Sequence, residues 1–431
     1  MQIKINGQTI SLAAPEPFLS ILRREKIYFP LYCGGRGTCG KCRIRITEGS
    51  LPITTEDRQF FSEDELKAGY RLGCRAVITA SCAITFEEIQ REDGFYVPPV
   101  QHAESSVREP IQRQNTAEAY GVKSDKDSRM PDKVSLSIAV DIGSTTLVMA
   151  LVHTDSGKIV TEYRGLNHQR SYGTDVMSRI KAAVEDGQEQ AMQALIRQDL
   201  AEGIVSLLKS ADAPIEQIVI AGNTTMLHLL RGYDCRGLSA WPFQPVNLDF
   251  EELSTAELLG ESPLVENCLL IETKVTLIAG ISAFVGADIS AGLWGCGITG
   301  NEKPHLFLDL GTNAEMAVGN KDGMLVSSAA AGPAFEGGQL SCGTGSIPGA
   351  VRDVRIQYGL VRYETIGRKP PVGICGSGLV SAISEMRKSR MMDNTGRLSP
   401  RYASGGLEII PGKIVITQAD IREYQKARAA I

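Results

Sequence analysis

Polar and apolar residues alternate along the start of the chain, MQIKINGQTISL. This alternation is typical of strands with one buried face, and residues 3–5 and 9–12 flank Asn6-Gly7, a dipeptide that favours a tight hairpin turn. After the hairpin, apolar residues recur at helical spacing over residues 17–26, and the proline that opens this segment is common at the first position of a helix. The pattern therefore predicts a β-hairpin followed by a short helix.

Two more local patterns complete the first segment. Alternation over residues 42–47 predicts a strand, and Ser62-Glu-Asp-Glu65 is a capping box that opens a short helix. Residues 93–133 are rich in Gln, Glu, Ser, Asp and Pro and keep no hydrophobic period, which is typical of a flexible linker. We therefore expect a small mixed β domain over residues 1–92, with a linker after it.

From Val134 onward, strand-like and helical patterns alternate in the manner of an α/β protein. This part also contains an internal repeat. Both IAVDIGSTTLVMA (138–150) and LFLDLGTNAEMAV (306–318) have an apolar triplet, Asp, an apolar residue, Gly, two small polar residues and a second strand-like run. Two hairpins with matching flanks indicate a duplication. We expect two related lobes, residues 134–300 and residues 301–431.

Composition and charge exclude several kinds of partner. The net charge is −5, from 45 basic and 50 acidic residues, and there is no long basic run, so neither a nucleic acid nor an anionic membrane is expected to bind. The N-terminus has no signal-peptide pattern, and the longest apolar stretch, residues 275–287, is too short to span a bilayer. We expect a cytoplasmic protein, whose ten cysteines would ligate metal or stay reduced.

Four of these cysteines have a ligand-like spacing. They are Cys33-x5-Cys39-x2-Cys42, in a glycine-rich loop, and Cys74. The spacing is one residue longer than the plant-type C-x4-C-x2-C…C pattern of a 2Fe-2S cluster. Zinc is the main alternative, although tetrahedral zinc sites usually present two close pairs and only one CxxC pair is present in this loop. Over residues 1–92 the chain resembles the plant-type and adrenodoxin-like ferredoxins, which implies a 2Fe-2S cluster on these four thiols.

The other cysteines lack ligand spacing. Cys82 lies in an alternating stretch, TASCAIT, and is expected to be a buried small apolar residue. The same interpretation is given to Cys235, Cys268, Cys296, Cys342 and Cys375.

The repeated hairpins carry a second kind of chemistry. A strand that ends in Asp and turns through Gly and Ser or Thr exposes backbone N–H groups to an anion. Asp141 and Asp309 would then hold Mg²⁺ through water, although two ordinary β-hairpins with acidic turns remain the alternative. No G-x-x-x-x-G-K-[ST] sequence is present, so this is not a P-loop enzyme. The residues expected to contact phosphate are Gly143, Ser144, Thr145, Thr146, Gly311, Thr312 and Asn313.

The two hairpins resemble the superfamily of acetate and sugar kinases, heat-shock chaperone ATPases and actin, in which two related lobes clamp ATP. Four segments, together with the ferredoxin-like start, resemble the reductive activators of corrinoid proteins. These segments are VIAGNTTMLHLL (219–230), AGISAFVGAD (279–288), AAAGPAFEGG (329–338) and PVGICGSGLV (371–380). The resemblance implies that Asn223, Thr224, Gly376, Ser377 and Gly378 line the nucleotide site. For GNTTM, a strand-to-helix turn with a capped end is the alternative.

This family resemblance implies a fold and a function. The fold is an α+β β-grasp ferredoxin-like domain followed by an α/β two-lobed domain of the actin, heat-shock chaperone and sugar-kinase type. The function is ATP- and Mg²⁺-dependent electron transfer from the 2Fe-2S cluster to a corrinoid protein, reducing Co(II) to Co(I). An upstream low-potential reductant and a homodimer through the ATP-binding domain are also implied. The alternatives are a small-molecule kinase with a redox-sensing domain and a redox module with an inactive ATP lobe.

One departure concerns the end of the chain. The superfamily's adenosine motif is a strand followed by a Gly-Gly loop, and neither Gly337-Gly338 nor Gly405-Gly406 follows a clear hydrophobic strand. The sequence closes on TQADIREYQKARAAI, where Thr417 and Asp420 predict a helix start with no terminator after it. We therefore expect the chain to be truncated at its C-terminus, which would weaken its binding of ATP.

Overall fold

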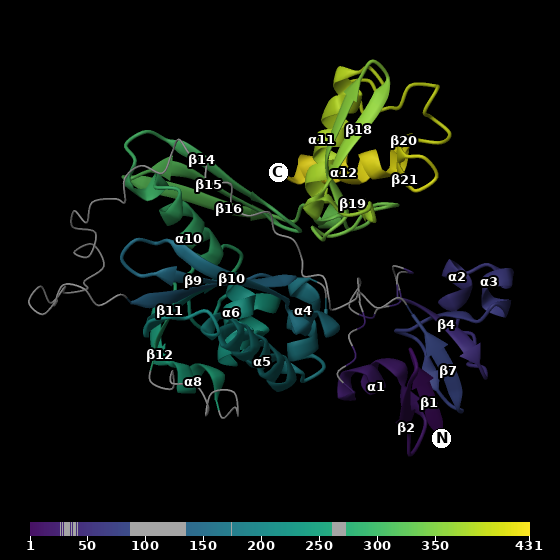
Figure 1. The fold of residues 1–431 in the computed structure, drawn as a ribbon, viewed down its shortest axis with the longest axis horizontal. Coiled ribbons are helices and arrows are strands. Elements are labelled where there is room, and N and C mark those ends of the chain that lie inside the picture. Colours follow the sequence, from purple (N-terminus) through teal and green to yellow (C-terminus); the bar gives the residue numbers. More distant parts are fainter. Residues whose placement is uncertain are drawn as a thin grey trace, which may run out of the picture.

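The structure is a computed structural model that describes residues 1–25, 27, 29, 35, 37, 40, 42–86, 135–173, 175–260 and 273–431 (Figure 1). The predicted linker and Cys268 lie outside these ranges. The N-terminal residues, the elements β8 to β13, and the elements from α10 onward have their own hydrophobic cores. We refer to the second and third of these parts as the first lobe and the second lobe.

The N-terminal part is a mixed five-stranded sheet with one helix packed against it, which is the β-grasp arrangement. The strand order is β2-β1-β7-β4-β5, and β1 pairs antiparallel with β2 but parallel with β7. Helix α1 buries Phe18, Ile21 and Leu22 in the core that it shares with the sheet. The elements are β1 (Gln2–Ile5), β2 (Gln8–Ser11), β3 (Glu16–Pro17), α1 (Phe18–Arg24), β4 (Arg43–Glu48), α2 (Asp57–Phe60), α3 (Glu63–Lys67), β5 (Tyr70–Leu72), β6 (Val77–Ile78) and β7 (Cys82–Thr85).

The local predictions for this part are confirmed. Asn6 and Gly7 turn the first hairpin with positive φ angles of 44° and 95°, which glycine and asparagine adopt at little cost. Ser62 caps α3, and the Ser62 and Glu65 side chains bond each other's backbone N–H groups. Helix α1 ends at Arg24, slightly earlier than expected.

The first lobe is a six-stranded sheet in the order β10-β9-β8-β11-β13-β12, with α5 and α6 below it in Figure 1. Strands β8, β11 and β13 run parallel to one another, so their carboxyl ends meet at one edge. Its elements are β8 (Leu136–Ile142), β9 (Thr146–His153), β10 (Ile159–Leu166), η2 (His168–Ser171), α4 (Val176–Val184), α5 (Glu189–Leu208), β11 (Ile215–Gly222), α6 (Thr224–Arg231), α7 (Arg236–Ser239), β12 (Glu251–Ser254), α8 (Thr255–Leu259) and β13 (Lys274–Leu277).

The second lobe contains two small sheets, β14-β15-β16 and β18-β17-β19, and a two-stranded ribbon. Helix α10 joins the lobes, because its Ile289 and Leu293 pack on the first of these sheets. The elements are α10 (Ala287–Gly295), η3 (Ile298–Gly300), β14 (His305–Leu310), β15 (Ala314–Asn320), β16 (Gly323–Ala329), η4 (Pro333–Glu336), β17 (Ala350–Gln357), β18 (Leu360–Thr365), η5 (Ile366–Arg368), β19 (Gly373–Ile374), α11 (Gly376–Lys388), β20 (Leu407–Ile410), β21 (Ile414–Ile416) and α12 (Gln418–Ala430).

The internal repeat corresponds to a repeated structure. Strands β8 and β9 form an antiparallel hairpin that continues into β10, and β14 and β15 form one that continues into β16. The predicted helix at the end of the sequence is also present. Thr417 caps α12 in a capping box with Asp420, whose buried carboxylate also accepts bonds from the Ser341 backbone and hydroxyl.

One prediction about the cysteines is wrong. Cys296 was expected to be buried, but it is exposed at the C-terminal end of α10. Cys296 is the C-cap residue, just past the last turn of the helix, and Trp294 and Gly295 before it are exposed as well. Cys82, Cys235 and Cys375 are buried as predicted, and Cys342 is half-buried.

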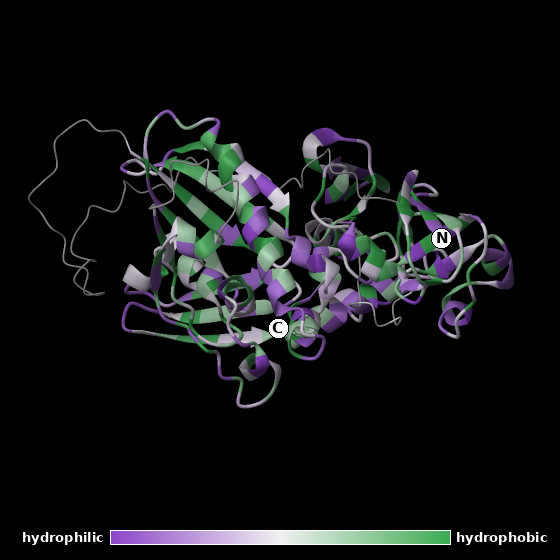
Figure 2. Ribbon diagram, turned by 90° about the horizontal axis from the view of Figure 1, so that it is seen from below, coloured by the Kyte–Doolittle hydropathy of each residue, from purple (hydrophilic) through white to green (hydrophobic). Residues whose placement is uncertain are grey.

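Figure 2 shows apolar residues concentrated along the strands, with mixed apolar and polar residues along the helices. This distribution is that of sheets whose inner faces form the cores and of helices that cover them. In the part of the chain that the structure describes, no helix has both the length and the apolar character that crossing a membrane requires.

Candidate functional site

The sheet register of the N-terminal part brings two of the predicted cluster ligands together. Cys42 directly precedes β4 and Cys74 follows β5, and these strands pair antiparallel with Arg43 opposite Leu72. The start of β4 therefore meets the end of β5, and the Gly73 N–H donates to the Cys42 carbonyl at 2.7 Å. The two Sγ atoms lie 3.2 Å apart, close enough for both thiols to ligate one metal ion.

Three glycines in the segment before Cys42 have a backbone conformation that suits a chain wrapped around a cluster. Gly35, Gly37 and Gly40 have positive φ angles of 78°, 74° and 69°, a region that favours glycine. At Gly40 an added Cβ would also lie 2.6 Å from the Phe60 ring. Cys33 and Cys39 lie outside the described residues, so the complete ligand set stays a prediction, but the described part of the loop fits it.

The first predicted phosphate loop, residues 143–146, lies at the carboxyl edge of the first-lobe sheet. It follows β8 directly, and the Gly143 N–H donates to the Thr146 carbonyl at 2.9 Å to close the turn. Strand β11 runs parallel beside β8, with Ile142 opposite Gly222. An added Cβ on Gly222 would lie 2.9 Å from the Ile142 carbonyl oxygen, so this close approach depends on glycine. Asn223 and Thr224 follow at the same edge.

The turn at Asn223 is a capped helix start, as its alternative interpretation stated. The Asn223 side chain accepts the Met226 N–H at 3.0 Å, and the Thr224 hydroxyl donates to the Ser282 carbonyl at 2.7 Å. The turn also contacts the start of α10, because an added Cβ on Gly286 would lie 2.5 Å from the Asn223 Cα. Capping the helix and lining a site are therefore compatible at this position.

The second predicted phosphate loop, residues 311–313, is closed by a tighter turn than the first. The Gly311 N–H donates to the Asn313 carbonyl at 2.8 Å, two residues on, whereas the Gly143 N–H donates to the carbonyl three residues on. The Thr312 hydroxyl donates to the Glu336 carboxylate, and the Thr312 carbonyl accepts the Gly332 N–H at 2.9 Å. These contacts tie the loop to the AAAGPAFEGG segment.

Four carboxylates from the two lobes interact electrostatically, and we call Asp141, Asp288, Asp309 and Glu315 the acidic cluster. Solvent reaches Asp141, but the surrounding protein displaces much of its water, and Asp288 and Asp309 add negative charge. These effects raise the pKa of Asp141 to about 6, while partial burial and Asp309 raise that of Asp288 to about 6. Partial burial, with Asp288 and Asp309, raises the pKa of Glu315 to about 7. Solvent reaches Asp309, but the surrounding protein displaces part of its water and raises its pKa as well.

Raised pKa values in grouped carboxylates indicate a site whose negative charge is not neutralised by the protein itself. A bound cation would neutralise it. No three His, Cys, Asp or Glu side chains within the described ranges are grouped tightly enough to ligate a metal ion directly. That Asp141 and Asp309 hold Mg²⁺ through water stays a prediction.

Two cluster members were missed by the sequence analysis. Asp288 lies in the first turn of α10, and the quoted segment AGISAFVGAD ends on it. Glu315 lies directly opposite Asp309 in the β14–β15 hairpin. The hairpin register could have predicted Glu315 from the sequence. The place of Asp288 in the acidic cluster depends on the contact between the starts of α6 and α10. No pattern of neighbouring residues in the sequence indicates this contact.

The predicted residues at the start of α11 lie beside the second phosphate loop. Gly376 and Ser377 line a cavity of about 820 Å³ between α11 and β17, together with Leu310 and Phe335, whereas Gly378 packs under β17. An added Cβ on Gly376 would lie 1.6 Å from the Phe335 carbonyl oxygen, so only glycine fits there. Because Leu310 directly precedes the loop, the cavity adjoins it.

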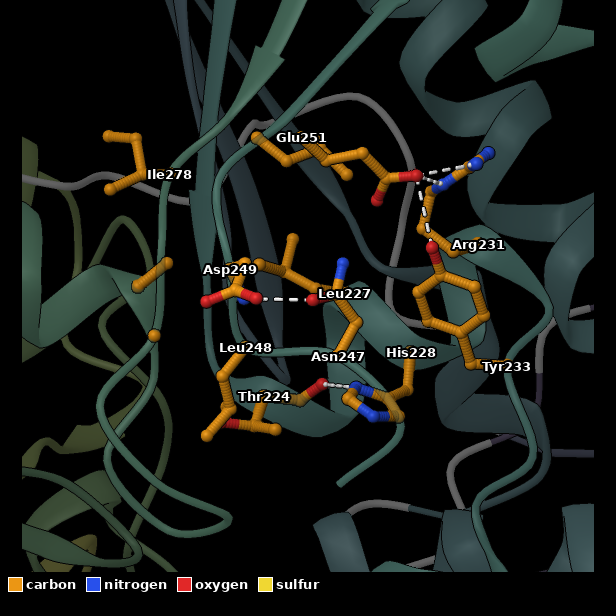
Figure 3. A pocket seen from close by; sticks show the side chains of 13 residues that line it. Thr224, Leu227, His228, Arg231, Tyr233, Asn247, Leu248, Asp249, Glu251 and Ile278 are labelled. Atoms are coloured by element: carbon orange, nitrogen blue, oxygen red, sulfur yellow. Dashed lines mark hydrogen bonds and ion pairs between the residues drawn. The ribbon is translucent and has the colours of Figure 1, made fainter. Parts of the chain in front are cut away.

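A second pocket, behind α6, is a closed network rather than a binding site (Figure 3). The His228 Nδ1–H donates to the Thr224 carbonyl at 2.8 Å, and Nε2 accepts the Val246 N–H at 3.0 Å, so the ring is held neutral. Burial lowers its pKa. Glu251 accepts bonds from Arg231 and Tyr233. The space of about 20 Å³ would hold little more than a water molecule.

Three family models match successive parts of the chain. Residues 3–79 match the 2Fe-2S iron-sulfur cluster binding domain, residues 136–301 match the RACo middle region, and residues 303–431 match the C-terminal domain of RACo, the ASKHA domain. The first match supports a 2Fe-2S cluster in the N-terminal part.

Relatives of known name match most of the chain. It is 29% identical over 93% of its length to the corrinoid activation enzyme RamQ of Eubacterium limosum, of which it covers 76%. It is 27% identical over 68% of its length to the [Co(II) methylated amine-specific corrinoid protein] reductase of Methanosarcina barkeri, of which it covers 57%. The chain thus spans between about half and three quarters of these relatives.

A solved structure agrees with both relatives. It is a reductive activator for corrinoid, iron-sulfur protein, and the match covers 100% of this chain and 82% of that one, with a TM-score of 0.59 and 25% identity. The β-grasp sheet, the repeated hairpins and these matches lead to one conclusion. The chain belongs to the family of reductive activators of corrinoid proteins, in which a 2Fe-2S ferredoxin-like domain precedes a two-lobed domain of the actin, heat-shock chaperone and sugar-kinase type.

Proposed function

We propose that this chain reduces the cobalt of a corrinoid protein from Co(II) to Co(I), with a 2Fe-2S cluster as electron donor and ATP as the source of free energy. The observation that carries the proposal is the presence of two distinct sites on one chain. The Cys42 and Cys74 thiols meet in the β-grasp part, and the acidic cluster gathers around the two phosphate loops in the lobes. A function that used only one of these sites would leave the other without a role.

The thiols of Cys33, Cys39, Cys42 and Cys74 would hold the cluster. When bound, it would take one electron from an upstream low-potential reductant and supply it to the cobalt of the partner. The chain's own contribution is to fix the last two thiols through the β4–β5 register and to leave the Cys74 side only half-buried, which keeps one side of the site near solvent.

The acidic cluster and the two loops would bind Mg·ATP. Asp141 and Asp309 would hold Mg²⁺ through water, and the cation would offset the mutual repulsion that raises the pKa values of the cluster. The backbone N–H groups of the two phosphate loops would face the phosphate oxygens. Asn223, Gly376 and Ser377 would line the same site.

The need for ATP follows from the direction of electron transfer. A plant-type cluster has a potential near about −400 mV. If the Co(II)/Co(I) couple of the partner lies lower, each deficit of about 59 mV costs a factor of ten in the equilibrium of a one-electron step. ATP shifts that equilibrium only if nucleotide-bound states of the activator bind the two redox forms of the partner with different affinities.

The test is to mix the reduced protein with a Co(II) corrinoid protein, with and without Mg·ATP, and to follow cobalt by its electron paramagnetic resonance signal. Loss of the Co(II) signal only with ATP is the expected result. A Co(II) signal that persists in the presence of ATP and fully reduced cluster would contradict the proposed function.

A further inference from the structure

The first three carbonyl groups of the first phosphate loop, those of residues 143–145, are held from the buried side. The Gly143 carbonyl accepts a bond from the Asn167 side-chain amide at 2.9 Å, and the Thr145 carbonyl accepts the Asn167 backbone N–H at 3.1 Å. The Ser144 carbonyl accepts a bond from the Arg179 guanidinium. Asn167 and Arg179 are both fully buried. Two residues thus fix three successive carbonyl groups, two of them through side chains and one through a backbone N–H.

This arrangement sets the direction of the loop's N–H groups. In a trans peptide the carbonyl and the following N–H point in opposite directions, and the peptides of this loop are trans. Because the carbonyls of Gly143, Ser144 and Thr145 point into the protein, the N–H groups that follow them point out of it. The outward side is the edge of the sheet where Asp141 and Asn223 lie. Outward N–H groups at this edge are what an anion requires.

Arg179 also connects the loop to the neighbouring helix start. It projects from α4, and its Nε donates to the Gly173 carbonyl at 2.8 Å while Nη1 lies 3.0 Å from the Met226 sulfur. Met226 is the residue whose N–H is capped by Asn223. The guanidinium therefore touches both segments that the site residues of the first lobe come from, the phosphate loop and the first turn of α6.

The charge of Arg179 is a second contribution. An arginine stays protonated at every accessible pH, and burying it costs free energy that an apolar residue of similar size would avoid. Beneath a loop that binds phosphate, the same charge attracts the anion, and in the protein interior it is screened less than a surface charge.

We propose that Arg179, together with Asn167, is a positioning residue for the phosphate groups of the nucleotide: it orients the first phosphate loop and places a positive charge beneath it. The identity of the ligand rests on the proposed function, whereas the orientation of the loop does not. Arg179 is fully buried behind the loop, so its loss would weaken phosphate binding by changing the loop and its charge rather than by removing a direct contact.

Three variants of the full chain test this inference: Arg179→Met, Arg179→Lys and, as a matched control, Arg231→Met, which removes a partly buried arginine of α6 that is paired with Glu251. Isothermal titration with Mg·ADP should show about ten- to hundredfold weaker binding for Arg179→Met, as for the loss of a charged hydrogen-bond donor. Arg179→Lys should recover part of the loss, because it keeps the charge but not the fork of donors. The control should bind as the wild type does.

Hydrogen exchange of the loop in the nucleotide-free protein gives a readout that does not depend on ATP. Peptides covering residues 142–147 should exchange faster in Arg179→Met than in wild type and Arg231→Met, with the visible spectrum of the cluster unchanged. Unchanged exchange in both Arg179 variants would overturn the inference. Faster exchange in a chain whose wild type binds no Mg·ADP would support the positioning role and contradict the proposed function alone.

Discussion

Cys42 and Cys74 differ from the other described cysteines because their sulfur atoms lie next to each other, 3.2 Å apart. Cys82 is also buried in the same domain, but it lies in β7 with apolar neighbours, and burial raises the pKa of its thiol. A thiol held neutral in a core is a poor metal ligand. Cys42 and Cys82 are both buried in this domain, but only Cys42 lies beside a second thiol, so burial alone does not identify a cluster ligand.

We predict that Cys74→Ala abolishes the 2Fe-2S cluster and that Cys82→Ala leaves it intact. The first variant removes a ligand, whereas the second removes one sulfur atom from a core, which costs stability but no ligand. Iron and sulfide content and the visible spectrum measure the difference. A cluster that survives in Cys74→Ala, or one that is lost in a folded Cys82→Ala protein, would refute the assignment of ligands.

The acidic cluster gives the second prediction at this scale, a dependence of Mg²⁺ binding on pH. The pKa values of Asp141 and Asp288 are about 6 and that of Glu315 is about 7, so protons compete with Mg²⁺ below these values. The Mg²⁺ concentration needed for half-maximal ATP hydrolysis should rise as pH falls from 8 to 5.5. A requirement for Mg²⁺ that stays constant over this range would show that the cluster does not hold the cation.

The same shifts predict an effect on stability in the absence of Mg²⁺. A carboxyl group whose pKa is raised by folding destabilises the fold when it is ionised. This loss of stability grows as pH rises from the pKa of the unfolded chain through the pKa of the folded protein. Asp288→Asn should therefore raise the melting temperature of the nucleotide-free protein at pH 8 and have less effect at pH 5.5. Asp212→Asn, an exposed change elsewhere in the first lobe, is the control. An equal shift at both pH values would contradict the electrostatic cause.

At the scale of elements, helix α10 determines how the acidic cluster assembles. Its first turn carries Asp288 against the start of α6, and its later residues pack on the sheet that carries Asp309 and Glu315. Gly286 allows the first contact, because an added Cβ would lie 2.5 Å from the Asn223 Cα and 2.7 Å from the Thr224 nitrogen. Backbone atoms cannot move aside as a flexible side chain can.

We predict that Gly286→Ala lowers ATP hydrolysis by at least about tenfold, because displacement of an active-site group by a fraction of an ångström costs on this order or more. The 2Fe-2S cluster should be unaffected. Gly295→Ala in the same helix is the matched control, since an added Cβ there meets nothing within 4 Å. Equal activity of both variants would show that the contact between α6 and α10 does not position Asp288.

The elements also show what the sequence could predict. The Asn6-Gly7 hairpin, the capping boxes at Ser62 and Thr417 and the repeated Asp-x-Gly hairpins depend on neighbouring residues, so their patterns are readable in the sequence. Asp288 and Arg179 act through contacts between distant segments. Cys296 shows the same limit, because its exposure depends on what packs around the C-terminal end of α10 rather than on its neighbours in the sequence.

At the scale of the whole molecule, the two sites lie in separately folded parts with separate cores. Substitutions at one site should therefore leave the other intact. This independence makes it possible to ask whether the sites act in one reaction, because a protein with a full cluster and no working nucleotide site can be prepared. Asp141→Asn is such a variant, since it keeps the size of the side chain and removes its charge.

The most direct test is the yield of Co(I) partner at equilibrium, measured with reduced wild-type protein and reduced Asp141→Asn, each with and without Mg·ATP. Wild type with ATP should accumulate Co(I). Wild type without ATP, and the variant under both conditions, should leave the cobalt mostly as Co(II), with ATP hydrolysis in the variant lower by at least about a hundredfold. Full reduction of the partner without ATP would contradict the account and favour a kinase function for the lobes.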